Sequence, residues 1–563
     1  MNAYRTDKDL PKDFLVFQEA GFSDPGDENR PNRLCVCFSD VHFTDGTVGN
    51  QSAETVVWEN VFGRIKELCR QHDVRELHLL LVGDVVDMIR TAQWAKTGVY
   101  PWERDNPQFR ENLQEIIQGI IENHSKPGTQ SGFFARLKRL FVADHSETAA
   151  KPGFFYWLNQ LSEDLNNVRI QKLVLLGNHD KEMLADNATL KKFYEECLGQ
   201  PLPALSVNYK QWIGQMYFSD PDHYLTNSPD TAPWLPFYWG DRGFRLFVTH
   251  GQWRDEDNCR AVKANPGLPG WKVSDGWDLA AWQKLQYSPF TEPCFGDTVA
   301  AGLLAGFIFR TKAQLQSLIK DEPHLHDEIK RLLRILDELD LYRPTYLAVG
   351  RMIEETWRLR KKGGTLIQAN EIIEKQLRFS MHQWLSWDFT RQSARPLFKI
   401  AIMCTRILLA AIKPFSSRLE LGAIYLMMRA LSKLKTGLMS FSDAPSYREM
   451  QSFPAFLPEY RNYGFRIHSE GHTHISLQEE LYFSEPAHSL SHKSYTYINL
   501  GAWRDQIVTA KKGKYRRRGI GRALCILDLV PEAQSGEDGK NRERRYNFWI
   551  EDIMSWGDNL DRL

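Results

Sequence analysis

The chain has 563 residues, of which 42% are hydrophobic and 25% are charged, a composition typical of folded globular proteins and too apolar for a disordered chain. Its 71 lysines and arginines balance 71 aspartates and glutamates, which excludes a globally basic nucleic-acid binder and an acidic solvating tail. The longest uncharged apolar run, residues 298–309, is too short to span a bilayer as a helix.

The N-terminal segment 1–32 is an extension that precedes the first predicted strand. It has no apolar stretch after a basic start, so it does not predict a secretory signal. Eight cysteines are scattered along the chain without a Cys-x-x-Cys pair, a pattern that predicts thiols in a reducing compartment. We therefore expect a cytoplasmic protein.

Five short apolar runs predict buried strands, and each run ends at polar residues. In chain order they cover residues 33–40, 76–84, 172–180, 244–251 and 465–474. Residues 54–72, between the first two runs, have apolar residues at helical spacing. Strand, helix and strand in this order predict an α/β layered sheet. Because ligands of such sheets gather beyond the carboxyl ends of the strands, the polar residues there are candidates for a site.

Two long interruptions separate the predicted strands and divide the chain. One covers about residues 95–155, and the larger one has helical apolar patterns such as that of residues 326–339. The predicted division is an N-terminal extension, the first part of a core, a mainly helical insertion or lid, and the second part of the core with a C-terminal segment. These four parts cover residues 1–32, 33–255, 256–460 and 461–563.

Each predicted strand end carries a short polar motif. The motifs are Asp40-Val41-His42, Gly83-Asp84-Val85-Val86-Asp87, Gly177-Asn178-His179-Asp180, His250-Gly251 and Gly471-His472-Thr473-His474. Each motif alone is a weak signal, but their conjunction at strand ends is specific. Carboxylate, imidazole and amide ligands together suit manganese, iron or zinc better than they suit a cysteine-based structural zinc site.

Together these motifs resemble the calcineurin-like metallophosphoesterase superfamily, whose pattern is D-x-H, G-D-x-x-D, G-N-H-D/E, a later histidine and G-H-x-H. The resemblance covers roughly residues 33–92, 168–255 and 463–505. It implies a four-layer α/β/β/α sandwich enlarged by the helical insertion. It also implies the metal ligands, which are Asp40, His42 and His474 for one metal, Asn178, His250 and His472 for the second, and Asp84 bridging both.

The same resemblance implies a phosphohydrolase with two divalent metal ions, for which manganese is favoured over iron or zinc. A metal-bridging hydroxide would attack phosphorus, so no serine or cysteine nucleophile is needed. His179 would stabilise the phosphoryl group and protonate the leaving oxygen, and Asp180 would orient or charge-stabilise that imidazole. Asp87 would accept hydrogen bonds from the ligands and fix their tautomers.

The large insertion carries a basic, apolar segment at residues 394–441. From Arg395 to Lys435 it has eight lysines and arginines against one acidic residue, Glu420. Basic amphipathic helices of this kind can bind anionic membrane surfaces, so the segment predicts peripheral membrane contact of a membrane-associated protein. The alternative is a pair of ordinary helices packed on the core.

The position of this insertion, between the HG and GHTH motifs, is similar to that of the helical lid of UDP-diacylglucosamine pyrophosphohydrolases. That similarity implies a lipid-linked pyrophosphate substrate. Gln252 departs from it, because that family usually has aspartate after HG.

Two other functions stay open from the sequence. The same two-metal core cleaves nucleic acid in some relatives, so a nuclease or nucleotide phosphodiesterase is the alternative enzyme. Basic residues interleaved with Leu, Ile and Met, without clustered aromatic positions, favour a lipid over a single-stranded nucleic acid. A non-catalytic scaffold fits less well, because His179 and every ligand are retained. In the superfamily that the motifs resemble, a similar Asn-x-Gly closes the metal-side loop. Asn499 and Gly501 either do the same or merely end a strand, and we assign neither to the site.

Overall fold

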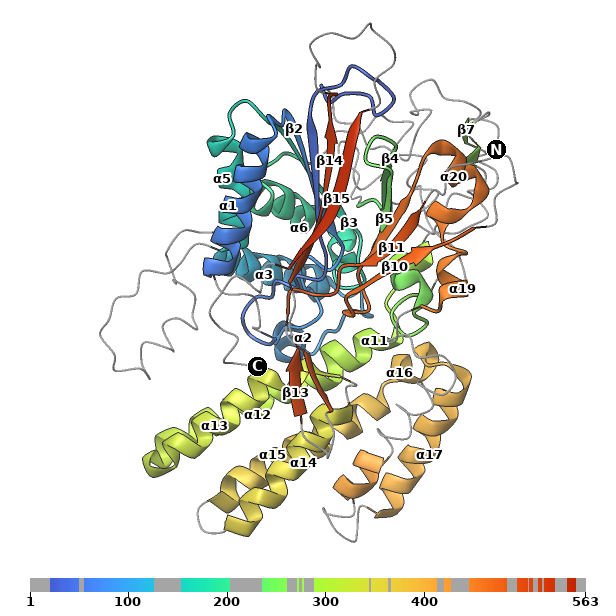
Figure 1. The fold of residues 1–563 in the computed structure, drawn as a ribbon. Coiled ribbons are helices and arrows are strands. Elements are labelled where there is room, and N and C mark those ends of the chain that lie inside the picture. Colours follow the sequence, from blue (N-terminus) through green and yellow to red (C-terminus); the bar gives the residue numbers. More distant parts are fainter. Residues whose placement is uncertain are drawn as a thin grey trace, which may run out of the picture.

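Two five-stranded sheets and many helices make up a mixed α/β protein (Figure 1), which confirms the predicted α/β class. The structure is a computed structural model that describes residues 21–49, 55–125, 153–202, 235–260, 271–272, 276–277, 288–343, 346–362, 366–412, 420–426, 445–483, 494–504, 506–509, 515–518, 521–531 and 544–552. Parts of the predicted extension, of the 95–155 insertion and of the basic segment lie outside these residues.

The first sheet contains the first three predicted strands and has the order β15-β14-β1-β2-β3. Its strands are β1 (Arg33–Phe38), β2 (Glu76–Val82), β3 (Arg169–Leu175), β14 (Arg522–Leu529) and β15 (Arg545–Asp552). The first three are parallel, and β14 joins β1 as an antiparallel neighbour. Every residue of β1 and β2 is buried, as expected for strands that are covered on both faces.

The second sheet contains the other two predicted strands and has the order β10-β11-β9-β5-β4. Its strands are β4 (Tyr238–Asp241), β5 (Leu246–Thr249), β9 (Ile467–Glu470), β10 (Leu477–Leu481) and β11 (Tyr495–Asn499). Strands β5, β9 and β11 are parallel, so their carboxyl ends lie at one edge of the sheet.

The two sheets pack against each other through alternate side chains of their strands. Cys37 and Val82 of the first sheet share one buried apolar cluster with Val248 and Ile498 of the second. The side chains on the other face of β1, such as Val36, belong to a second cluster with the helices α1 (Thr55–Gln71), α3 (Pro107–His124) and α5 (Phe154–Asp164). Period-two alternation therefore separates the core between the sheets from the core beneath the helices.

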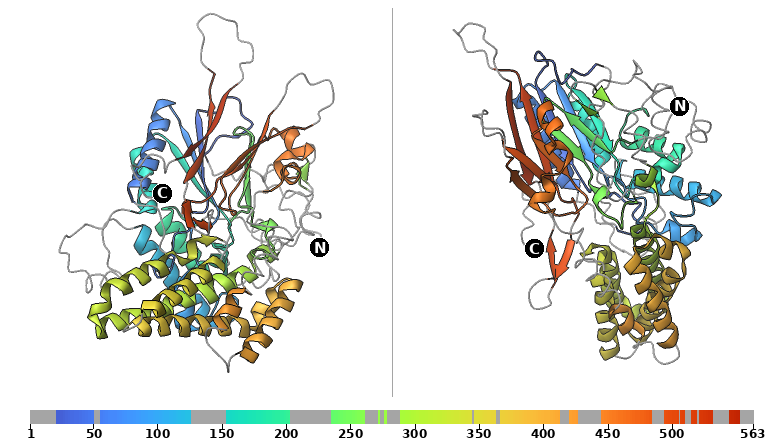
Figure 2. Two further views of the ribbon diagram at one scale, coloured as in Figure 1. Left: turned by 60° about the horizontal axis from the view of Figure 1, so that its bottom comes forward. Right: turned by 90° about the vertical axis from the view of Figure 1, so that its right-hand side faces the viewer.

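Helices dominate the described part of residues 256–460. Their main elements are α10 (Ser288–Thr291), α11 (Phe295–Asp297), a π-helix (Thr298–Ala305), α12 (Gly306–Asp321), α13 (His326–Glu338), α14 (Tyr346–Lys362), α15 (Leu366–Ser386), α16 (Asp388–Ser393), α17 (Pro396–Ile412), α19 (Tyr447–Met450) and α20 (Pro458–Tyr463). Those from α12 to α17 gather at one end of the two sheets, whereas α19 and α20 lie beside the second sheet (Figure 1 and Figure 2). The helices α12 to α17 have a buried apolar cluster of their own, to which Leu332 of α13 and Met381 of α15 belong.

Short elements complete the fold. They are α2 (Gln93–Thr97), α6 (Asn187–Lys192), a π-helix (Phe193–Cys197), the strand pair β6 (Trp271–Lys272) and β7 (Gly276–Trp277), and the 3₁₀ segments Lys181–Ala185, Gln252–Arg254, Pro323–Leu325, Leu339–Leu341 and Pro454–Phe456. Among the residues described, no helix is both long and apolar enough to cross a membrane.

A third, three-stranded sheet ties the helical insertion to the C-terminal part of the chain. It contains β8 (Tyr342–Arg343), β12 (Gln506–Thr509) and β13 (Tyr515–Arg518). Strand β8 of the insertion runs parallel to β12, with Tyr342 opposite Ile507 and Arg343 opposite Val508. This pairing fixes the position of the insertion against the loops that follow the main strands.

Candidate metal centre

The loops at the strand ends bring the seven predicted ligands together. Three groups have ligand atoms within 4.8 Å of one another, and they are Asp40, His42 and His474; Asp84, His250 and His472; and His42, Asp84 and His179. The first two groups contain six of the predicted ligands in the two predicted sets. The seventh, Asn178, places its Oδ1 3.0 Å from Nδ1 of His472. Buried carboxylates and imidazoles at such separations can hold metal ions.

Asp84 lies between the two groups. Its Oδ2 is 3.6 Å from Nε2 of His42 and 3.4 Å from Nε2 of His250. The two histidines come from opposite sheets, because His42 follows β1 and His250 follows β5. A carboxylate in this position can reach a cation on either side.

The backbone at these positions is in a conformation that most side chains avoid. Five of the ligands have positive φ angles, which are 52° at Asp40, 49° at His42, 51° at Asp84, 64° at His472 and 59° at His474. The left-handed region costs a non-glycine residue about 1–3 kcal/mol, and such residues cluster at functional sites. The local strain indicates that the fold holds these side chains at a site.

Two motif glycines leave room for the ligands. A Cβ at Gly177 would lie 2.2 Å from Oδ1 of Asp84, and a Cβ at Gly471 would lie 2.2 Å from Oδ2 of Asp40 and closer still to Oγ of Ser39. Either contact would displace a predicted ligand. The motifs therefore need glycine at these positions for the close approach of two loops.

The histidine tautomers fit a cation. Nδ1 of His250 is 2.8 Å from the carbonyl oxygen of Val82, so Nδ1 donates a hydrogen bond there and Nε2 faces the Asp84 carboxylate. Nε2 of His250 is buried without a hydrogen-bond partner among the described residues. Burial opposes protonation of His250, but the carboxylates of Asp84 and Asp40 raise its pKa to about 10. Either a proton or a metal ion at Nε2 of His250 would be stabilised by these two carboxylates. The carboxylates and imidazoles of the site therefore fit a metal ion.

Asp87 orients the predicted catalytic histidine. Its Oδ1 is 2.8 Å from Nδ1 of His179, and its Oδ2 is 3.2 Å from Nδ1 of His42. Arg90 donates to the same Oδ2 at 2.6 Å. Asp87 thus contacts a predicted ligand as expected, and it also has the orienting position that we expected of Asp180.

We expected Asp180 to orient or charge-stabilise His179, but the hydrogen bonds of the Asp180 side chain go to other groups. The Asp180 carboxylate is buried and accepts four backbone N–H groups, those of Asp84 (2.6 Å), Val85 (2.9 Å), Val86 (3.0 Å) and Gly177 (3.0 Å). Its side chain therefore holds the loop of the Gly-Asp motif against the loop after β3. Adjacency to His179 in the sequence did not reveal this, because the two side chains leave the loop in different directions.

Two polar residues at the site were not among the predicted site residues. Oδ2 of Asp255 lies 3.3 Å from Nε2 of His472, and the signal for it was a carboxylate in the loop after the HG motif. The Asn499 side chain donates to the carbonyl oxygen of Gly471 at 2.8 Å and accepts from the N–H of Gly501 at 3.1 Å. Asn499 therefore closes the loop that carries His472, in agreement with the first of the two alternatives for this turn.

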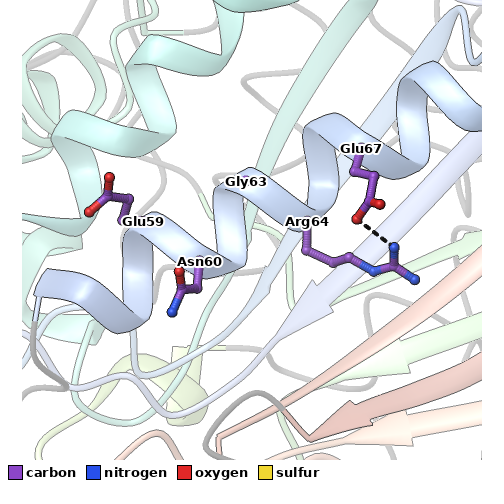
Figure 3. Close-up of a pocket in the computed structure, with 5 residues that line it drawn as sticks. All are labelled: Glu59, Asn60, Gly63, Arg64 and Glu67. Atoms are coloured by element: carbon purple, nitrogen blue, oxygen red, sulfur yellow. Dashed lines mark hydrogen bonds and ion pairs between the residues drawn. The ribbon is translucent and has the colours of Figure 1, made fainter. Parts of the chain in front are cut away.

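A surface hollow on α1 is separate from these residues (Figure 3). Its lining residues Glu59, Asn60, Gly63, Arg64 and Glu67 belong to one helix, and Arg64 is paired with Glu67 at 2.7 Å. None of the seven predicted ligands lines this hollow.

Comparisons of this chain with protein-family models, with curated proteins and with solved structures found no match.

Proposed function

We propose that the chain is a dinuclear-metal phosphohydrolase of the calcineurin-like metallophosphoesterase type. The observation that supports this most directly is the position of Asp84 between the group of Asp40, His42 and His474 and the group of His250 and His472. Two separate metal sites have no use for a shared carboxylate, whereas two metals about 3.5–4 Å apart can share one. The packing of the two sheets, with helices outside the first, supports a four-layer α/β/β/α sandwich.

In this proposal the metal ions supply the chemistry and the chain positions their ligands. When bound, a pair of divalent cations activates water and withdraws charge from the phosphoryl group. The chain holds Asp40, Asp84 and the imidazoles in place through strained loops and the glycines that let these loops meet. Manganese remains the favoured metal, with iron and zinc as alternatives, because the ligands are oxygen and imidazole nitrogen.

His179 has the geometry of a general acid. Its Nδ1 donates to Asp87, so Nε2 is the nitrogen that exchanges a proton with the leaving oxygen. The ring lies 4.9 Å from the ring of His42, which places it beside the metal ligands. Asp87 fixes the orientation of the ring, while Asp180 acts on the loop.

Metal content and turnover, measured together, test this proposal. We expect the purified protein with Mn²⁺ to hydrolyse model phosphate esters and anhydrides. Asp84→Asn should lose bound metal and activity, whereas His179→Ala should lose activity and keep its metal, as measured by elemental analysis. His324→Ala, which alters an exposed histidine of the insertion, is the matched control and should change neither quantity. Unchanged turnover in His179→Ala would contradict the role of this residue.

We also propose that the insertion contacts an anionic membrane surface through α17. Ile400, Met403 and Ile407 are 56%, 54% and 65% exposed and lie on one face of this helix, while its opposite face packs on the insertion's own core. Lys399 and Arg406 are exposed on the same helix. An exposed apolar face with basic neighbours is the pattern of a helix that lies in the headgroup region.

A further inference from the structure

Three arginines from distant parts of the chain meet beside the candidate metal centre. Arg90 follows Asp87 by three residues, Arg343 belongs to β8 of the insertion, and Arg504 follows the turn of Asn499 and Gly501. The parallel pairing of β8 with β12 places Arg343 next to the strand that begins just after Arg504. The third sheet therefore brings an arginine of the insertion to the core.

Asp340 connects the three arginines. Its carboxylate accepts a hydrogen bond from Arg504, and Nε of Arg90 is 3.9 Å from the same oxygen. Nη1 of Arg343 donates to the backbone carbonyl oxygens of Asp340 (2.6 Å) and Tyr342 (3.0 Å). The hydrogen bonds of Arg343 thus go to neutral groups, and the nearby carboxylates of Asp340 and Asp87 offset its charge less than burial and the other two arginines oppose it.

Positive charge is in excess in this cluster. Arg90 pairs with Asp87 and lies near Asp340, while Arg504 pairs with Asp340. The three guanidinium groups therefore share two carboxylates, and that of Asp87 also accepts a hydrogen bond from His179. Nη1 of Arg504 is buried and has no hydrogen-bond partner among the described residues. Burial, together with the neighbouring charges of Arg90 and Arg504, lowers the pKa of Arg343 to about 9. Cations that repel each other in a buried site are stabilised by an anion.

The cluster adjoins the predicted metal ligands. Nη1 of Arg90 is 3.3 Å from Nδ1 of His42. A small ligand could therefore contact both the metal centre and these arginines.

We propose that Arg90, Arg343 and Arg504 form a binding site for a second phosphoryl group of the substrate, beside the group that reacts at the metal centre. The inference rests on the proposed phosphohydrolase function and specifies its substrate as a molecule with two phosphoryl groups. Guanidinium groups bind phosphate oxygens in pairs of parallel hydrogen bonds, which makes arginine the preferred residue for such a site. The unpaired Nη1 of Arg504 and the charge of Arg343 are the groups available to the anion.

Calorimetric titration of the metal-free, full-length protein tests the site without any turnover. Inorganic pyrophosphate should bind at least tenfold more tightly than inorganic phosphate, because it can reach the arginines and the imidazoles of the metal ligands together. Arg343→Gln should weaken pyrophosphate binding about tenfold, the scale of one lost charged hydrogen-bond pair. Arg334→Gln removes one positive charge at an exposed position of α13 and should leave the affinity unchanged.

Arg343→Lys provides a second measure if Arg343→Gln is poorly folded. It keeps the charge but loses the paired hydrogen bonds, so its affinity should lie between those of the wild type and of Arg343→Gln. Equal pyrophosphate affinity in the wild type and the Arg343 variants would overturn the proposal. Equal affinity of the wild type for phosphate and pyrophosphate would overturn the assignment of a second phosphoryl group.

The two proposals fail in different ways. In the Mn²⁺-loaded protein, Arg343→Gln should reduce kcat/KM for a diphosphate substrate and leave kcat/KM for a simple monoester close to that of the wild type. Arg343-dependent pyrophosphate binding by a protein that hydrolyses none of the substrates would contradict the phosphohydrolase function and support the anion site. If the protein hydrolyses both substrate classes and Arg343→Gln lowers kcat/KM equally for the two, the result would support the phosphohydrolase function and overturn the anion site.

Discussion

Replacement of Asp180 by asparagine should loosen the loop of the Gly-Asp motif. The buried carboxylate accepts four backbone N–H groups, whereas an asparagine amide can accept at one oxygen and presents N–H groups at the other position. Two backbone donors, from either the pair of Asp84 and Gly177 or the pair of Val85 and Val86, would then lose their acceptor inside the protein.

The expected cost follows from these two donors. A buried donor without a partner costs about 1–3 kcal/mol, so two of them cost about 2–6 kcal/mol. Burial and the charge of Asp84 raise the pKa of Asp180 to about 8, so a neutral amide relieves part of the cost of the buried carboxylate. We therefore expect a net loss of about 3 kcal/mol, which is about a hundredfold in the opening equilibrium of the loop.

Hydrogen exchange of the backbone amides at residues 84–86 measures this opening directly. Their protection should fall about a hundredfold in Asp180→Asn. The control is Asp186→Asn, because Asp186 caps α6 by accepting from the N–H of Thr189 and asparagine caps a helix about as well as aspartate. Equal protection in the wild type and Asp180→Asn would refute this account. A pH–rate profile displaced in Asp180→Asn with unchanged protection would restore its role in orienting His179.

Two further predictions concern a buried lysine and the exposed face of α17. Burial lowers the pKa of Lys172 from 10.5 to about 8, so the unfolded chain binds one proton more than the folded chain between these pH values. The free energy of unfolding should therefore rise by up to about 3 kcal/mol across this range, and the difference between wild type and Lys172→Met in chemical unfolding should follow that curve; a pH-independent difference would contradict it. Ile407→Glu should abolish flotation with anionic liposomes and leave the melting temperature nearly unchanged, because Ile407 is 65% exposed; Ser386→Glu, at an exposed position of α15, is its control. If Ile407→Glu floats with anionic liposomes as the wild type does, the proposal that α17 contacts the membrane is contradicted.

The convergence of the ligands could be predicted from the sequence because it depends on a general property of sheets. Asp40 and Asp84 follow parallel neighbouring strands, and His250 and His472 follow parallel strands of the second sheet. The carboxyl ends of parallel strands lie at one edge, so residues far apart in the chain meet there. The α/β class followed from the same apolar runs.

The partners of individual side chains could not be predicted in the same way. Asp180 was assigned to its sequence neighbour His179, but Asp87 reaches that ring from another loop. The position of Arg343 beside Arg504 depends on the pairing of β8 with β12, and a strand of two residues leaves no periodic signal in the sequence. Contacts of this kind are set by loop conformation and long-range packing, which local patterns do not contain.

The neighbours of β1 have a consequence for how the protein is made. One of the two edges of this strand pairs with β14, and the paired residues Arg33 and Asp528 are 495 residues apart. During synthesis, the edge of β1 that pairs with β14 therefore stays without this partner until the 495 residues that separate Arg33 from Asp528 have been made. We expect the newborn polypeptide to depend on chaperones during this interval, and fragments that end before β14 to aggregate.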